Sequence, residues 1–256
     1  MEKARLSTAR WLIRAADRLV DAVVTIALLV VFLYGGYALW DTWTVYHKAA
    51  VSDEIMRFKP DQSNPTLEEL RAVNPDVCAW LTIDGTSIDY PVLHGRDNME
   101  YLNKNIYGEY SLGGSVFLDS ANHADFSDFY SLLYGHHMDG GAMFGDVKKF
   151  EQESYFDAHR TGTLITPGKC YSLEIFACIC VSAYDTYMFT PGVPDQAAQQ
   201  ALLDYIRSNA LHYRADGDGG VTRIIALSTC SSAVTDGRTM IVARMVEENN
   251  TGGAEE

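Results

Sequence analysis

The chain has 256 residues, of which 47% are hydrophobic, and its formal net charge is −14. This length is sufficient for one globular domain with a sizeable core in addition to a membrane anchor. The acidic balance argues against nucleic-acid binding, because proteins of that class present a basic surface to the phosphate backbone.

A long apolar stretch lies near the N-terminus. Residues 22–40, AVVTIALLVVFLYGGYALW, contain no charged side chain, and a helix of this length matches the ~30 Å hydrocarbon core of a bilayer. Several basic residues precede it in residues 1–21, and Asp41 follows it. The pattern predicts one transmembrane helix, with residues 1–21 in the cytoplasm and the bulk of the chain outside the cell membrane. A cleaved signal peptide is the competing interpretation, but the apolar run is long and lacks a convincing cleavage site.

The segment after the apolar run, residues 41–74, is predicted to form a stalk and N-terminal helices. It contains PTLEELRAV, which favours a short helix with Asn64 as its N-cap and Pro65 in its first turn. Residues 75–247 are predicted to form the globular domain. The polar tail, residues 248–256, is predicted to be disordered.

Short strands dominate the pattern of the globular domain. Two β-rich runs flank Asp84-Gly85 and predict a hairpin. Helical spacing of Ala, Leu and Ile predicts one helix over residues 194–211, with Asp195 near its start. Seven or eight strands with short turns and one inserted helix indicate a closed or nearly closed β-barrel. The strands that follow the hairpin are predicted at residues 113–119, 129–137, 161–167, 169–184, 222–229 and 238–246.

The last two strands are joined by a loop within LSTCSSAVTDGR, residues 227–238. Along RIIALSTC both alternating sets of side chains are mostly apolar, which predicts a strand buried on both faces, with Cys230 at its exit. Arg238 begins the antiparallel partner strand. Because paired strand ends lie ~5 Å apart, we expect Cys230 and Arg238 to be neighbours at one rim of the sheet.

A cysteine beside an arginine suits nucleophilic acyl transfer. A nearby cation lowers the pKa of a thiol, and arginine stays charged and can hold a developing oxyanion. The leaving amine also needs a proton donor, for which histidine is the usual choice. Of the seven histidines, only His136 and His137 lie where a predicted buried strand enters a glycine-rich bend. Adjacent strand residues face opposite sides, so at most one of them can address the site, and the residues alone leave both open.

The segment LYGHHMDGGAMFGDV, together with LSTC and a downstream arginine, resembles the sortases, which are cysteine transpeptidases of Gram-positive bacteria. The resemblance covers about residues 75–246 and maps the family's catalytic positions onto His136, Cys230 and Arg238. Ala226 stands where the family often has threonine. RDNMEYLNKN, GSVFLD and YGHHMDGGAMF resemble class B in particular, and the predicted helix at residues 194–211 is similar to the class B insertion.

This resemblance implies a mainly β fold, in which a closed eight-stranded sortase-type barrel follows N-terminal helices. The inserted helix is then expected between the sixth and seventh strands. No cofactor and no metal are expected. The resemblance implies that His136, Cys230 and Arg238 are catalytic and that Asn98, Leu102, Tyr134, Ser228 and Thr229 bind the substrate.

The implied function is that of a membrane-anchored transpeptidase. Its partner would be a surface or pilin protein that carries a C-terminal sorting signal, cleaved after threonine to leave a thioester on Cys230. An amine of the lipid-linked cell-wall precursor would then accept the protein. A class B enzyme that polymerises pilins through a pilin lysine is the alternative.

Three other classes of function compete with transpeptidation. A cysteine hydrolase would use water in place of an amine, and a non-catalytic domain would only bind peptides. A metal site built from Cys230 with His136 or His137 lacks four ligands at sensible spacing.

Overall fold

The computed structural model describes residues 2–49, 53–60, 67–215, 220–230 and 236–248. It divides the chain into two compact units, Met1–Val45 and Tyr46–Glu256. The predicted N-cap Asn64 and the adjacent Pro65 lie outside the described residues, as does the tail from residue 249 onwards.

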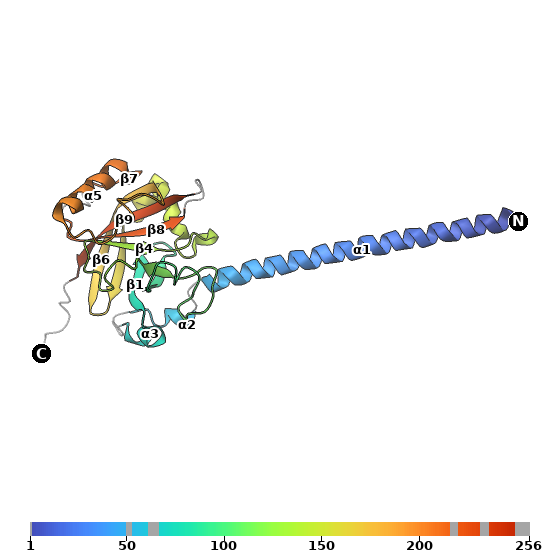
Figure 1. Cartoon of the computed structure of the whole chain (residues 1–256), viewed down its shortest axis with the longest axis horizontal. Helices are drawn as coiled ribbons and strands as arrows, with labels where there is room; N and C mark the ends of the chain where they lie inside the picture. The colour runs from blue at the N-terminus through green and yellow to red at the C-terminus, as the bar shows by residue number, and fades with distance from the viewer. Residues whose placement is uncertain (1, 50–52, 61–66, 216–219, 231–235, 249–256) are drawn as a thin grey trace. The chain divides into compact units, whose positions relative to one another are not determined.

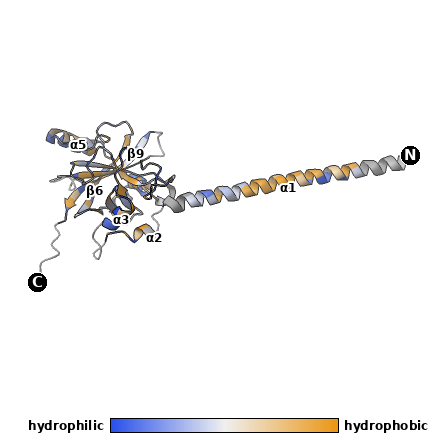
Figure 2. Ribbon diagram, turned by 60° about the horizontal axis from the view of Figure 1, so that its bottom comes forward, coloured by the Kyte–Doolittle hydropathy of each residue, from blue (hydrophilic) through white to orange (hydrophobic). Residues whose placement is uncertain are grey.

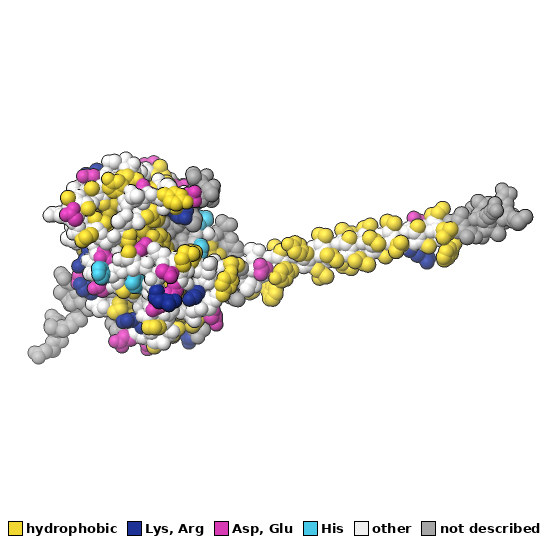
Figure 3. Space-filling view, viewed as in Figure 1, with side chains coloured by type: hydrophobic (Ala, Val, Ile, Leu, Met, Phe, Trp, Pro, Cys, Tyr) yellow, Lys and Arg dark blue, Asp and Glu magenta, His cyan; other side chains and the backbone are white. Residues whose placement is uncertain are grey.

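One continuous helix, α1 (Glu2–Ala49), contains all the described residues of the first unit and extends beyond the predicted span of residues 22–40 at both ends. No proline interrupts this sequence, so every residue can continue the helical hydrogen-bond pattern. Its stretch Trp11–Thr44 is long and apolar enough to cross a membrane, and none of that stretch is buried. The middle of the helix is coloured as hydrophobic along the ribbon (Figure 2), and apolar side chains cover the face of it that Figure 3 shows, which suits a lipid environment.

The second unit is a β-barrel with helices on its outside (Figure 1). Its α-helices are α2 (Asp53–Met56), α3 (Glu68–Val73), α4 (Glu153–Ala158) and α5 (Gln196–Asn209), and its 3-10 helices are η1 (Asp139–Gly141) and η2 (Gly145–Glu151). The strands are β1 (Val77–Ile83), β2 (Asp89–Leu93), β3 (Val116–Leu118), β4 (Tyr130–Tyr134), β5 (Thr161–Thr166), β6 (Lys169–Ser182), β7 (His212–Tyr213), β8 (Ile224–Cys230) and β9 (Gly237–Glu247).

Eight of these strands close the barrel, in the order β5-β1-β2-β3-β4-β8-β9-β6, because β6 also pairs with β5. The β2/β3 and β4/β8 pairs are parallel, and the other pairs in the ring are antiparallel. The expected closed eight-stranded barrel is therefore confirmed. The ninth strand, β7, was not predicted; it pairs with β6 over two residues, Ala177 and Cys178.

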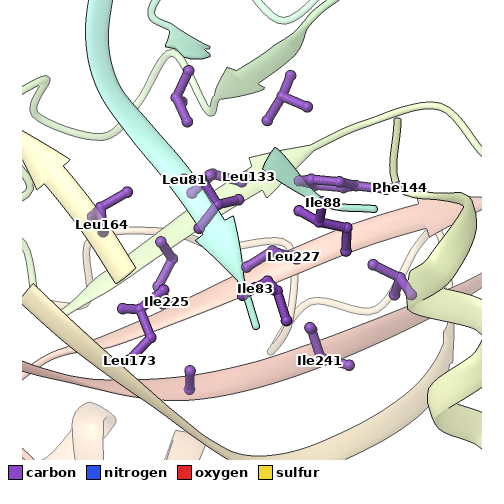
Figure 4. Close-up of a cluster of buried hydrophobic side chains, with 14 of the residues drawn as sticks. Leu81, Ile83, Ile88, Leu133, Phe144, Leu164, Leu173, Ile225, Leu227 and Ile241 are labelled. Carbon is purple, nitrogen blue, oxygen red and sulfur yellow. The ribbon is translucent and has the colours of Figure 1, made fainter. Parts of the chain in front are cut away.

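Strand β8 lies between two of the hydrophobic clusters, one inside the barrel and one outside it. Ile225 and Leu227 of β8 pack into the inner cluster, while Ile224 and Ala226 belong to the outer one. All four side chains are fully buried, so β8 is covered on both faces, as predicted. Figure 4 shows the inner cluster, in which the labelled residues are Leu81, Ile83, Ile88, Leu133, Phe144, Leu164, Leu173, Ile225, Leu227 and Ile241.

Helix α5 packs against the outer cluster through Leu202 and Ile206, which are buried four residues apart on one face of the helix. It follows β6 and precedes β7 along the chain, so the inserted helix lies where it was expected. The Asp195 carboxylate caps the helix, since it accepts a hydrogen bond from the backbone N–H of Ala198 at 3.1 Å.

Replacing this cap is expected to weaken α5. Asp195→Ala leaves the first turn without its side-chain acceptor, and the free energy of unfolding should fall by about 1 kcal/mol. Gln196→Ala, at the next position in the exposed first turn, is the matched control and should change it by less than about 0.5 kcal/mol. Denaturant unfolding measures both, and equal effects would contradict the capping role.

Candidate active site

The ends of three strands meet at one rim of the barrel. Strands β4 and β8 are parallel and pair Tyr134 with Ser228, so His136 and Cys230 each lie two residues further along the same direction. Strands β8 and β9 are antiparallel and pair Cys230 directly with Arg238. The predicted proximity of Cys230 and Arg238 is thus present in the backbone register, and the parallel pair brings the histidine segment to the same rim.

Cys230 is the last residue of β8. Its side chain and residues 231–235 lie outside the described residues. Ser228 and Thr229, the two residues that precede Cys230 in β8, line a pocket at this rim.

The pocket has a volume of about 310 Å³. It contains seven of the eight residues for which a catalytic or binding role was predicted, and Cys230 is the eighth. The predicted residues in its wall are Asn98, Leu102, Tyr134, His136, Ser228, Thr229 and Arg238, and those not predicted are Met99, Phe117, Gly135, Ala183 and Phe189.

The structure distinguishes the two adjacent histidines. The imidazole of His136 lies in the pocket wall, with its Nε2 atom 2.8 Å from the backbone carbonyl oxygen of Leu102. His137 forms an isolated β-bridge with Met143 and is not part of that wall. Of the two candidates, His136 is therefore the one placed to act in the pocket.

A close contact explains the glycine that precedes these histidines. A Cβ atom added at Gly135 would lie 2.6 Å from the ring of Phe144, which is fully buried in the inner cluster. The backbone N–H of Phe144 also donates to the carbonyl oxygen of His136 at 3.0 Å. Glycine thus lets the loop after β4 pack against the barrel core, and this packing fixes the backbone of His136.

A buried carboxylate, Asp119, organises another wall of the pocket. Its Oδ2 atom accepts hydrogen bonds from the Tyr134 hydroxyl at 2.8 Å and from the Asn98 amide at 2.9 Å. Its Oδ1 atom accepts from the backbone N–H of Ala121 at 2.9 Å. Burial and the Asp119 charge raise the pKa of Tyr134 well above its ordinary value, although Arg238 acts in the opposite direction. Tyr134 therefore stays a neutral hydrogen-bond donor.

Removing the Asp119 carboxylate should disorder this wall. Asp119→Ala leaves the buried Tyr134 and Asn98 donors without their acceptor, and we expect a loss of about 1–3 kcal/mol in the free energy of unfolding, with a higher KM. Tyr134→Phe removes only one donor and should cost less than Asp119→Ala. Unfolding curves and steady-state kinetics are measured for both variants. A larger loss of stability in Tyr134→Phe than in Asp119→Ala would contradict this role of Asp119.

Two buried hydroxyl groups belong to residues in the pocket wall. The Ser228 Oγ and Thr229 Oγ1 atoms are buried and have no hydrogen-bond partner among the residues that the structure describes. A buried hydroxyl left in this state costs about 1–3 kcal/mol. A peptide bound beside the end of β8 could satisfy them.

A larger cleft of about 490 Å³ also contains one cysteine and one histidine, Cys78 and His94. Cys78 is a poor candidate nucleophile, because its Sγ atom donates to the carbonyl oxygen of Val92 at 3.4 Å and complete burial raises its pKa. Burial also raises the pKa of Cys170, to about 11, and those of Cys178 and Cys180. None of these four thiols has the lowered pKa of a reactive cysteine.

Metal binding finds no support in the part of the chain that the structure describes. There, no group of three or more His, Cys, Asp or Glu side chains is arranged to hold an ion. Asp119, which could serve as a cation ligand, instead accepts hydrogen bonds from the pocket wall.

Known proteins resemble this chain in sequence and in fold. The family model for the sortase domain matches residues 81–246. Sortase B of Listeria monocytogenes is 30% identical over 239 residues, which span 87% of this chain and 95% of that protein. The crystal structure of a Streptococcus pyogenes class B sortase involved in pilus biogenesis is 40% identical, with a TM-score of 0.63 over 70% of this chain and 97% of that chain. The crystal structure of Staphylococcus aureus sortase B is 28% identical, with a TM-score of 0.64 over 71% and 87% of the two chains.

Proposed function

The chain belongs to the sortase family of cysteine transpeptidases, and to class B within it; on this premise we propose that it transfers proteins with a C-terminal sorting signal to an amine at the cell surface. The observation that carries the proposal is the pocket that holds His136 and Arg238 at the rim where Cys230 ends β8. Cys78 also shares a cleft with a histidine, but its buried thiol donates to the Val92 carbonyl oxygen and its pKa is raised.

The proposed reaction begins with attack by the Cys230 sulfur on the carbonyl carbon of the signal's threonine. Arg238 binds the peptide and stabilises the negative charge that develops on the carbonyl oxygen. As the C–N bond breaks, His136 donates a proton to the departing amine. The C-terminal fragment leaves, and the rest of the protein remains bound to Cys230 as a thioester.

The second half of the reaction reverses these roles. The acceptor amine enters the pocket, gives a proton to His136 and attacks the thioester carbonyl. The C–S bond breaks and the sulfur leaves as a thiolate, so the enzyme returns to its starting state with an amide bond made for the one that was broken. Asn98, Leu102, Tyr134, Ser228 and Thr229 hold the peptide in the proposed groove.

The N-terminal helix suits a reaction at the external surface of the cell membrane. Its stretch Trp11–Thr44 is long and apolar enough to span a bilayer, and basic residues concentrate before residue 22. We place the N-terminus in the cytoplasm and the catalytic domain outside the membrane. Both the sorting signal and a lipid-linked cell-wall precursor are accessible there.

The amine of a cell-wall precursor is the acceptor that we propose first, and a pilin lysine is the second candidate. One observation favours the second: the S. pyogenes enzyme, which is involved in pilus biogenesis, is 40% identical to this chain, against 28% for S. aureus sortase B over a similar share of it. The amine that resolves the purified thioester would separate the two acceptors.

Mass spectrometry tests the proposed activity. The full chain in detergent is incubated with peptides of the type Asn-Pro-x-Thr-Gly, Asn-Pro-x-Thr-Asn or Asn-Pro-x-Thr-Ser, and the acyl adduct is mapped to a cysteine. We expect an adduct on Cys230 that added triglycine converts to an amide. Release of only the free acid in the presence of triglycine would identify a hydrolase instead. Intact peptides with unmodified Cys230 would contradict the proposal.

A further inference from the structure

The contact between His136 and Leu102 restricts the chemistry of the imidazole. A backbone carbonyl oxygen can only accept a hydrogen bond, so the 2.8 Å contact from His136 Nε2 to the Leu102 oxygen requires a proton on Nε2. The neutral ring then carries no proton on Nδ1. Only Nδ1 can exchange a proton with a reacting group while this hydrogen bond is kept.

The position of the Leu102 carbonyl depends on a glycine twelve residues later in the chain. A Cβ atom added at Gly114 would lie 2.3 Å from the Leu102 oxygen and 2.8 Å from the Tyr101 oxygen. Gly114 also has a φ of +58°, a region that glycine occupies without strain. Any side chain at this position must push the Leu102 carbonyl away from where it now meets His136.

Further hydrogen bonds hold the two ends of this loop together around Gly114. The backbone N–H of Ser115 donates to the Tyr101 oxygen at 3.0 Å, and the Ser115 hydroxyl donates to the Lys104 oxygen at 2.7 Å. The Tyr101 and Lys104 carbonyl groups, which precede and follow Leu102 in the loop, are therefore held in place. A displacement caused at Gly114 would fall on the Leu102 carbonyl between them.

We propose that Gly114 is a positioning residue: through the Leu102 carbonyl it holds His136 in the Nε2–H form, so that Nδ1 is the atom that gives and takes the catalytic proton. The proposal rests on the function proposed for His136. The carbonyl also stabilises the imidazolium that forms when Nδ1 takes up a proton, because its oxygen faces the charged ring. Gly114 itself is absent from the pocket wall, so it acts without touching the substrate.

The same loop supplies a matched control. Gly108 also has a positive φ, +78°, but an added Cβ atom would meet nothing within 4 Å. Gly114→Ala and Gly108→Ala therefore impose a similar backbone strain in one loop. Only the first pushes against the Leu102 carbonyl, so the difference between the two variants reports the positioning effect.

The test uses the full chain in detergent micelles with 15N-labelled histidine, and the His136 signals are identified by their loss in His136→Gln. We expect neutral His136 to carry its proton on Nε2 in the wild type and in Gly108→Ala. In Gly114→Ala we expect a shift toward the Nδ1–H form and a fall in kcat of about 10-fold or more, with little change in KM. Gly108→Ala should stay within about 2-fold of the wild-type kcat.

An Nδ1–H form in the wild-type protein would overturn the proposal. So would a Gly114→Ala variant with the wild-type tautomer and the same kcat as Gly108→Ala. If Gly114→Ala does not fold, the wild-type tautomer still tests the Nε2–H assignment on which the proposal depends, and an Nδ1–H form overturns it. The NMR measurement needs no substrate, so failure of Cys230 to form a thioester would contradict the proposed function and leave the tautomer result standing.

Discussion

Replacing Cys230 by alanine is expected to abolish thioester formation and to lower transpeptidation by at least about 10³-fold, as removal of a covalent nucleophile does. The other described thiols cannot substitute, because burial raises the pKa of each one. Chromatography of the transpeptidation product measures the loss. Retained peptide binding and an unchanged melting temperature would show that the variant is folded.

Cys170→Ala is the matched control for this experiment. Cys170 is a free cysteine at the start of β6 and is absent from the pocket wall. We expect the Cys170→Ala variant to keep activity within about 2-fold of the wild type, since the residue has no part in the proposed chemistry. If activity survived in Cys230→Ala and was lost in Cys170→Ala, the nucleophile would be Cys170 of β6. The assignment to Cys230 would then be wrong.

Replacing Arg238 by lysine is expected to lower kcat/KM by about 10²- to 10³-fold, the effect of losing a donor to an oxyanion. Lysine keeps the charge but presents a compact ammonium group in place of a planar fork of N–H donors, so it should not restore the activity. Steady-state kinetics with one peptide substrate, combined with a direct measurement of peptide binding, separate the loss of binding from the loss in the chemical step.

The same substitution elsewhere on β9 controls for the change of side chain. Arg244 lies on that strand and forms an ion pair with Glu174 of β6, away from the pocket wall. Arg244→Lys should leave kcat/KM within about 2-fold of the wild type. Equal losses of kcat/KM in the two variants would mean that the substitution acts through the structure of β9. Arg238 would then have no direct part in the reaction.

Much of the barrel was predictable because its strands are buried on both faces or alternate regularly. The runs that became β6, β8 and β9 carry long apolar segments bounded by turns, and the structure places a strand in each. Strand β7 has two residues, which is too short for a periodic signal. Helix α1 extends beyond the apolar run because the flanking sequence holds no proline to end it, whereas the prediction used hydropathy alone.

The site was predictable where it depends on strand register and not where it depends on loops. Two apolar runs around a turn were enough to pair Cys230 with Arg238. The walls made by Met99, Ala183 and Phe189 come from loops whose conformations depend on tertiary contacts that no local pattern encodes. The aromatic residues just after β6 are the one signal that could have pointed to Phe189.

Asp119 and His136 show two further limits of the sequence. Asp119 ends a predicted strand, but only the structure reveals its donors Tyr134 and Asn98. The choice between His136 and His137 came from the resemblance to a family. Strand alternation could exclude one of the two but could not say which, because β4 ends at Tyr134 and the backbone after it is irregular.

The most direct test is a crystal structure of the protein with a sorting-signal analogue bound through Cys230. We predict that the guanidinium of Arg238 lies about 2.7–3.1 Å from the oxygen of the attacked carbonyl. We also predict that His136 Nδ1 lies about 3–3.5 Å from the sulfur or from the position of the leaving nitrogen. A peptide seated elsewhere, or a sulfur beyond the reach of both side chains, would contradict the account.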